Sequence, residues 1–162
     1  MSTPPSLVSI IIMCYQHGSY VQEAIESAIA QEYEPLEIIV SDDGSSDHSA
    51  EVIASAAVKY PQIKTLLHRN NLGYTRAFNL AFRQSTGQYL IDLAADDVLL
   101  PGRVAAQVRA FEVAGKRTGV VYTNAHYINE QGDYLHPHFG KPPAKVPHEE
   151  PPSGNLYARL LY

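Results

Sequence analysis

The chain has 162 residues, of which 45% are hydrophobic and 18% are charged, a balance typical of one soluble globular domain. Its formal net charge of −5 argues against a nucleic-acid-binding surface, which would be basic. No apolar run approaches the roughly 20 residues that span a bilayer. The single cysteine, Cys14, cannot form an internal disulfide, so we expect a cytoplasmic protein. Any association with a membrane is expected to involve a longer chain.

Short apolar runs alternate with stretches of helical periodicity along the first 123 residues. The apolar runs predict buried parallel strands, and apolar residues spaced three and four apart predict amphipathic helices. This alternation predicts an α/β fold, a three-layer α/β/α sandwich around a mostly parallel sheet. The expected elements are strand 8–13, helix 20–31, strand 37–41, helix 49–60, strand 63–67, helix 75–84, strand 89–93, helix 102–114 and strand 119–123.

The pattern changes after residue 123. Residues 127–134 predict a hairpin that turns at Gln131 and Gly132, and the following loop, 137–152, holds six of the eleven prolines. Residues 153–162 have the pattern of the beginning of an amphipathic helix. We therefore expect a domain core at 1–135 and, at 136–162, a proline-rich loop and a helix that belong to a longer protein.

Two predicted strands end in pairs of carboxylates. Strand 37–41 runs into Asp42-Asp43-Gly44-Ser45-Ser46-Asp47, and strand 89–93 is soon followed by Asp96-Asp97. Local turn formation is one explanation, with Asp47 and Asp97 as N-caps of the next helices. Because the carboxyl ends of parallel strands meet at one edge of the sheet, the two turns together favour a ligand site. Carboxylates there could accept hydrogen bonds from a nucleoside or hold Mg²⁺ or Mn²⁺.

Three further groups of residues fall at the same predicted edge. The turn Asn70-Asn71-Leu72-Gly73 precedes a helix that carries Arg76, which could meet a phosphate or remain solvated. Tyr15-Gln16-His17, after the first strand, could form a wall of the pocket or an exposed loop. Cys14 ends a buried strand, so its side chain is more typical of a core residue than of a nucleophile.

In order and spacing, these segments resemble the inverting family 2 glycosyltransferases of the GT-A fold. The resemblance covers about residues 7–131 and implies that the chain is the N-terminal portion that binds a nucleotide-sugar. The segments that carry it are Val8-Ser-Ile-Ile-Ile-Met-Cys-Tyr-Gln16, Ala28-Ile-Ala-Gln31, Glu37-Ile-Ile-Val-Ser-Asp-Asp-Gly-Ser-Ser-Asp47, Asn71-Leu-Gly73, Ala77-Phe-Asn79, Gly87-Gln-Tyr-Leu90, and Asp96-Asp97 with Pro101.

The resemblance also implies a function and a set of site residues. A sugar would pass with inversion from a nucleoside-diphosphate sugar, UDP-sugar favoured, to a saccharide or lipid-linked acceptor in cell-surface polysaccharide synthesis. Asp96 falls at the metal-binding position for Mn²⁺ or Mg²⁺. The substrate-binding set comprises Cys14, Tyr15, Asp42, Asp43, Asn71, Arg76 and Asp97.

Two departures from the family pattern qualify these expectations. Ala94 stands where many members have a further Asp, which weakens metal binding or leaves more of it to phosphate oxygens and water. Asp92 shares a face with Asp96 only if the pleat stays regular. The catalytic base is expected beyond Tyr162, so we expect these residues alone to bind the donor without transferring sugar.

A nucleotidyltransferase and a non-catalytic nucleotide-binding or scaffold module remain as alternatives, although the first turn lacks the Lys or Arg that a nucleotidyltransferase needs.

Overall fold

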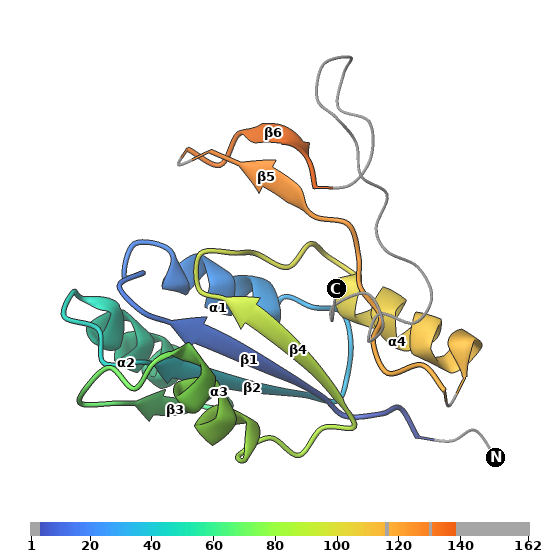
Figure 1. The fold of residues 1–162 in the computed structure, drawn as a ribbon, viewed down its shortest axis with the longest axis horizontal. Coiled ribbons are helices and arrows are strands. Elements are labelled where there is room, and N and C mark those ends of the chain that lie inside the picture. Colours follow the sequence, from blue (N-terminus) through green and yellow to red (C-terminus); the bar gives the residue numbers. More distant parts are fainter. Residues whose placement is uncertain (1–3, 116, 130, 139–162) are drawn as a thin grey trace, which may run out of the picture. The chain divides into compact units, whose positions relative to one another are not determined.

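The computed structural model describes residues 4–115, 117–129 and 131–138 (Figure 1). They form two units that divide after Gly119, and each is described by itself. No helix in these residues is both long and apolar enough to cross a membrane.

Four strands form the sheet of the first unit, all of them parallel, as predicted. They are arranged in the order β3-β2-β1-β4. Most residues of the central strands β1 and β2 are buried, which explains their continuous apolar runs. The strands are β1 (Val8–Cys14), β2 (Leu36–Asp42), β3 (Lys64–Leu67) and β4 (Tyr89–Ala94).

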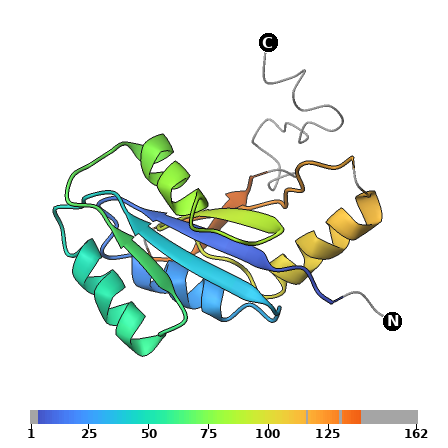
Figure 2. The same ribbon diagram turned by 90° about the horizontal axis from the view of Figure 1, so that it is seen from below.

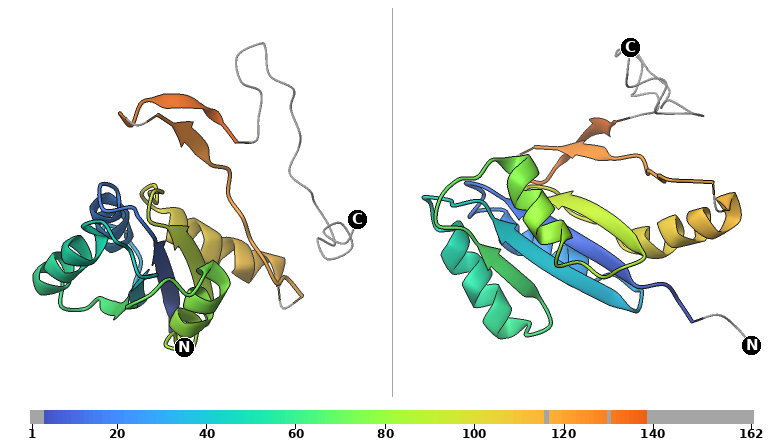
Figure 3. Two further views of the ribbon diagram at one scale, coloured as in Figure 1. Left: turned by 60° about the vertical axis from the view of Figure 1, so that its left-hand side comes forward. Right: turned by 60° about the horizontal axis from the view of Figure 1, so that its bottom comes forward.

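Helices cover both faces of the sheet, which confirms the three-layer prediction. Helices α1 and α2 lie on one face and α3 lies on the other (Figures 2 and 3). Val104 and Val108 of α4 belong to the same core cluster as α1 and α2. On the opposite face, α3 packs on the sheet through the small side chains of Ala77 and Ala81. The helices are α1 (Val21–Ile29), α2 (Ser49–Lys59), α3 (Tyr74–Phe82) and α4 (Arg103–Ala114).

The register of the sheet sets where the loops begin. Cys14 of β1 lies opposite Asp42 of β2, and Asp42 lies opposite Leu67 of β3. On the other side of β1, Met13 lies opposite Ala94, the last residue of β4. The four loops that leave these strands therefore start at the same edge, as the sequence predicts.

The predicted strand at 119–123 is wrong, because these residues form no strand in the structure. Their β-branched side chains favour extended backbone, but strand formation depends on packing against a covering surface. Val120 is 64% exposed, so the described residues supply little of that covering. The other helices and strands of the first unit are confirmed to within two residues at each end.

The second unit contains the predicted hairpin. Strands β5 (His126–Ile128) and β6 (Tyr134–Pro137) pair in antiparallel fashion. Gly132 lies in the turn between them with a φ of 83°, a left-handed conformation that favours glycine. Residues 139–162, which hold most of the predicted proline-rich loop and the predicted final helix, lie outside the described residues.

Candidate functional site

The turn after β2 is closed by its first carboxylate. Asp42 is 1% exposed. Its Oδ1 accepts a hydrogen bond from the Ser45 hydroxyl at 2.5 Å, and its Oδ2 accepts one from the Ser45 N–H at 3.0 Å. Both oxygens of Asp42 are thus used within the turn itself, as the local explanation of this motif predicts.

Gly44 lets this turn approach the loop that follows β3. Its φ is 70°, which L side chains rarely adopt. A Cβ at this position would also lie 2.4 Å from the carbonyl carbon of Asn70, well inside contact distance. Both the backbone angle and the neighbouring backbone therefore require glycine here.

Asp43 links the end of β2 to the end of β1 and to the loop that follows β3, and one of its carboxylate oxygens stays available. Its N–H donates to the Cys14 carbonyl at 2.8 Å, and its Oδ1 accepts from the Leu72 N–H at 2.7 Å. Its Oδ2 takes part in no hydrogen bond with the described residues. The side chain is only 3% exposed, so a ligand that reached it would meet a fixed acceptor.

The loop after β1 is fastened to the same turn. Gln16, with a φ of 60°, donates its N–H to Ser45 Oγ at 2.9 Å. Gly18 donates its N–H to Asp47 Oδ2 at 3.0 Å. These contacts leave the Tyr15 ring exposed at the edge, where the sequence predicts a pocket wall.

The prediction that Asp47 is the N-cap of α2 is wrong by one position, although its side chain still binds the first turn of the helix. The N-cap of α2 is His48, but Asp47 Oδ1 accepts the N–H of Ser49 at 3.0 Å. The Ser49 hydroxyl, followed by the N–H groups of Gly18 and Ser49, holds the pKa of Asp47 below its usual range. Asp47 is therefore an anchor of the helix start.

The carboxylates after β4 are far more open. The Asp96 side chain is 49% exposed, and its Oδ1 lies 3.6 Å from His17 Nδ1. Burial and the adjacent Asp96 raise the pKa of Asp97, and Arg103 lowers it in part. The prediction that Asp97 caps α4 is wrong, because the N-cap is Gly102. Gly102 adopts the left-handed conformation at the end of the turn that precedes the helix.

The pleat of β4 continues through its end. Asp92, Ala94 and Asp96 are all exposed, while the residues between them are buried. The three positions thus share a face, and the Tyr74 hydroxyl donates a hydrogen bond to Asp92. Because position 94 is alanine, Asp96 has no second carboxylate two residues before it on this face.

The loop that carries Asp96 is held by Ser27 of α1 and by Gln31, just after the end of α1, through contacts that the sequence did not reveal. The amide of Gln31 donates to the Leu100 carbonyl at 3.1 Å and accepts from the Val104 N–H at 3.2 Å. Ser27 Oγ accepts the Leu99 N–H at 3.0 Å. The one available signal was a polar residue, Gln31, at the end of an apolar helical stripe.

The site suits a divalent cation only if a bound diphosphate supplies some of the ligands. Among the described residues, no three His, Cys, Asp or Glu side chains lie together as a ligand group. Asp96 is exposed, and its one ion-pair contact in the described part of the chain is with His17. Mg²⁺ and Mn²⁺ bind readily through one or two carboxylates with phosphate and water completing the shell. The residues present therefore suit a cation that shares its ligands with a diphosphate.

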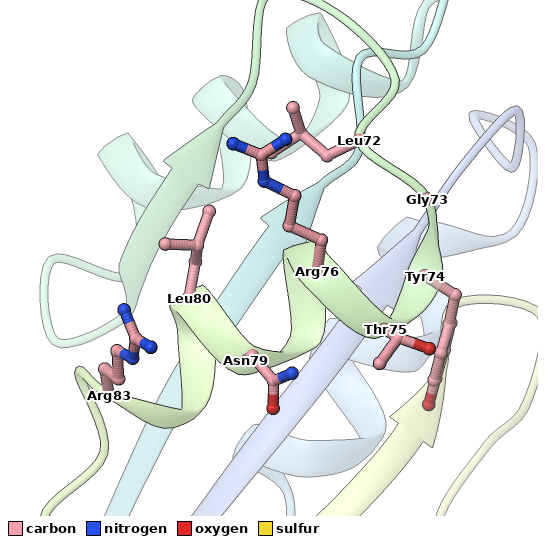
Figure 4. A pocket seen from close by; sticks show the side chains of 8 residues that line it. All are labelled: Leu72, Gly73, Tyr74, Thr75, Arg76, Asn79, Leu80 and Arg83. Carbon is pink, nitrogen blue, oxygen red and sulfur yellow. The ribbon is translucent and has the colours of Figure 1, made fainter.

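Three other predicted site residues have different surroundings. The Cys14 thiol is buried, and burial raises its pKa to about 11, so it belongs to the core and offers a ligand no surface. Asn71 Oδ1 accepts the Gly73 N–H at 3.0 Å. Arg76 lines an open groove of about 580 Å³ along α3 (Figure 4), which none of the predicted carboxylates lines.

Comparison with known proteins establishes the family. The model of glycosyl transferase family 2 matches residues 9–157. The chain belongs to this family. This is the family that the sequence predicts, and the nucleotidyltransferase alternative is set aside.

Sequence relatives span much more than this chain. An uncharacterized glycosyltransferase of Rickettsia felis is 33% identical over 87% of this chain and 23% of its own length. Chondroitin synthase of Pasteurella multocida is 32% identical over 80% of this chain and 13% of its own length. The chain thus spans less than a quarter of the length of either relative.

Solved structures confirm the GT-A fold. The mannosyltransferase PcManGT from Pyrobaculum calidifontis, in complex with GDP-Man and Mn²⁺, is 26% identical with a TM-score of 0.51, over 56% of this chain and 28% of that one. S. aureus TarS 1–349, in complex with UDP-GlcNAc, is 24% identical with a TM-score of 0.56, over 64% and 31% respectively. At this identity the second likeness concerns the fold alone.

Proposed function

We propose that this chain is the donor-binding part of an inverting glycosyltransferase in cell-surface polysaccharide synthesis. The sugar would pass from a nucleoside-diphosphate sugar to a saccharide or lipid-linked acceptor. The main support is the placement of Asp43 and Asp96 on loops from two strands at one edge, the first with an unused acceptor oxygen and the second exposed. The similarity to a chondroitin synthase and to a mannosyltransferase bound to GDP-Man is consistent with this role.

Asp43 is proposed to read the base. Its Oδ1 is already occupied by the Leu72 N–H, which leaves Oδ2 as a single acceptor. Uracil and thymine each present one ring N–H, whereas guanine presents two neighbouring N–H groups that call for two acceptors. This difference favours a pyrimidine donor over a GDP-sugar, which agrees with the predicted UDP-sugar, and Tyr15 would lie beside the nucleoside. Asp42, whose oxygens both bind Ser45, is proposed to shape the turn that holds the base.

Asp96 and Asp97 are proposed to lie at the diphosphate. A bound Mn²⁺ or Mg²⁺ would supply a Lewis acid that neutralises charge on the leaving nucleoside diphosphate. Asp96 would hold this cation, and Gln31 and Ser27 would keep the Asp96 loop in place. Asn71 and Arg76 remain predicted contacts of the donor, Arg76 through a phosphate.

Inversion requires an acceptor hydroxyl to attack the anomeric carbon in line, opposite the leaving diphosphate, while a carboxylate base removes its proton. We assign none of the described residues to that base. A non-catalytic nucleotide-binding module would use the same donor contacts, so the two functions differ only in whether sugar is transferred.

The roles of Asp43 and Asp96 are separable by calorimetric titration of UDP with Mn²⁺ and with EDTA. Asp43→Ala should weaken UDP binding about tenfold or more under both conditions, since it removes a hydrogen bond to a charged group. Asp96→Ala should remove only the gain that Mn²⁺ provides. Glu51→Ala, at an exposed position of α2, is the control and should change neither.

Two outcomes would contradict these roles. A loss in Asp43→Ala that occurs only with Mn²⁺ would move Asp43 to the cation. Unchanged Mn²⁺ dependence in Asp96→Ala would remove Asp96 from it.

A further inference from the structure

The middle of this acidic chain is basic. The 40 residues from Val52 to Ile91 contain five Lys or Arg residues and no Asp or Glu, although the whole chain has a net charge of −5. Lys59 is paired with Glu26 at 3.0 Å, and Lys64 with Glu37 at 2.6 Å. The other three, Arg69, Arg76 and Arg83, form no ion pair with the described residues.

Two of these arginines project from one side of α3. Arg76 and Arg83 are seven residues apart, which places them about 10 Å apart along the helix axis. They line the groove of about 580 Å³ together with Leu72, Leu80 and Asn79. Figure 4 shows the two guanidinium groups on the same side of the helix as Leu80. The groove thus combines unpaired positive charge with apolar side chains.

A stripe of aromatic residues runs along α3 beside the arginines. The rings of Tyr74, Phe78 and Phe82 stack in succession, with centroids 6.0 and 6.4 Å apart. Tyr74 is 55% exposed and Phe82 is 52% exposed. Exposed aromatic side chains next to arginines on one helix are typical of helices that lie at the boundary between lipid headgroups and acyl chains.

We propose that the outer face of α3 docks onto a membrane surface that contains anionic phospholipids. Arg76 and Arg83 contact headgroup phosphates, and Phe82 enters the boundary of the acyl chains. The surface attracts the arginines because its charge is complementary to theirs. The acidic remainder of the chain does not oppose this contact strongly, because charges farther away than about 8 Å are screened at physiological salt.

The lining of the groove favours lipid over a soluble polyanion. Apart from the arginines, its polar side chains are Tyr74, Thr75 and Asn79, and the Tyr74 hydroxyl is already bound to Asp92. The remaining two, Thr75 and Asn79, would form few hydrogen bonds with the hydroxyl groups of a saccharide. None of the proposed donor-site carboxylates lines the groove, and Arg83 has no predicted donor contact, so Arg83 separates membrane docking from nucleotide binding.

Sedimentation with lipid vesicles, without nucleotide, tests this docking surface. The chain should bind vesicles of phosphatidylcholine with phosphatidylglycerol, and far less those of phosphatidylcholine alone. Arg76→Gln/Arg83→Gln should weaken binding about 30-fold, since each arginine near such a surface is worth about fivefold. Arg83→Gln alone, at a residue with no predicted donor contact, should weaken it about fivefold. Arg109→Gln/Arg117→Gln removes the same charge from exposed positions outside the basic segment and should bind like the unaltered chain.

Thermal melts would show that the variants are folded. No binding of the unaltered chain to the anionic vesicles, or an equal loss in the control pair, would overturn the proposal. Binding of heparin through Arg76 and Arg83 without vesicle binding would also overturn it, and would identify the partner as a polyanionic saccharide. If vesicles bind as expected while UDP does not, only the proposed donor site fails.

Discussion

The carboxylate pairs that follow β2 and β4 are alike in sequence and unlike in the structure. Asp42 and Asp43 are buried, and three of their four carboxylate oxygens accept hydrogen bonds from Ser45 and Leu72. Asp96 is half exposed, and its ion-pair contact within the described residues is the 3.6 Å approach to His17. One turn is a closed network and the other is open.

This difference suggests how one sheet edge could bind the two ends of a nucleotide. A buried, hydrogen-bonded carboxylate is already oriented, so a ligand that binds it loses little freedom in the protein. An exposed carboxylate can take a cation without breaking bonds inside the protein. The environment of each Asp, rather than its residue type, therefore divides base recognition from diphosphate binding in our proposal.

The largest expected effect tests the closed turn. Gly44→Ala should lower the free energy of unfolding by about 3 kcal/mol, because the left-handed backbone strain adds to the clash with Asn70. Gly102→Ala is the matched control: its φ is 74° and it is left-handed, but a Cβ there would meet no atom within 4 Å, so it should cost about 1 kcal/mol. Urea unfolding measures both. Equal losses would show that the approach of the two loops does not matter.

Glu37, a carboxylate near the start of β2, is expected to make the stability of the fold depend on pH. Burial would raise the pKa of Glu37, but Lys64, Ser9 and Thr86 outweigh it and lower the pKa to about 2. Because this value lies below the ordinary 4.5, the stabilisation is complete above about pH 4.5 and is lost as the pH falls toward 2. Glu37→Gln should therefore cost about 2 kcal/mol at pH 7 and little near pH 2. A pH-independent cost in unfolding experiments would argue against this pairing.

A smaller effect compares the two turns directly. Asp42→Asn should cost about 1.5 kcal/mol, because an amide cannot accept both hydrogen bonds from Ser45. Asp96→Asn should change stability by less than about 0.5 kcal/mol, since the side chain is open. Thermal melts of the two variants check this. Similar losses would mean that the Asp96 turn is as closed as the other.

The sequence predicted the strands and helices of the first unit because their apolar periodicity is a local property. It failed at residues 119–123, where strand formation depends on a covering surface that no local pattern describes. The shared sheet edge at which the loops of Asp42 and Asp96 begin was predictable from the parallel order of the strands.

The different hydrogen bonding of Asp42 and Asp43 was not predictable. The partner of Asp42, Ser45, is local, but that of Asp43, Leu72, lies 29 residues away and depends on how two loops pack. The contact between Gln31 and the Asp96 loop spans 69 residues and was missed for the same reason. Arg76 was predicted from its place after a turn, but its groove along α3 depends on tertiary structure.

The most direct test of the donor site is calorimetric titration of UDP, dTDP and GDP into the unaltered chain, with Mn²⁺ and then with EDTA. Our account predicts that UDP and dTDP bind more tightly than GDP, because Asp43 offers one free acceptor, and that Mn²⁺ strengthens binding through Asp96. Binding that ignores Mn²⁺ and prefers GDP would contradict both assignments.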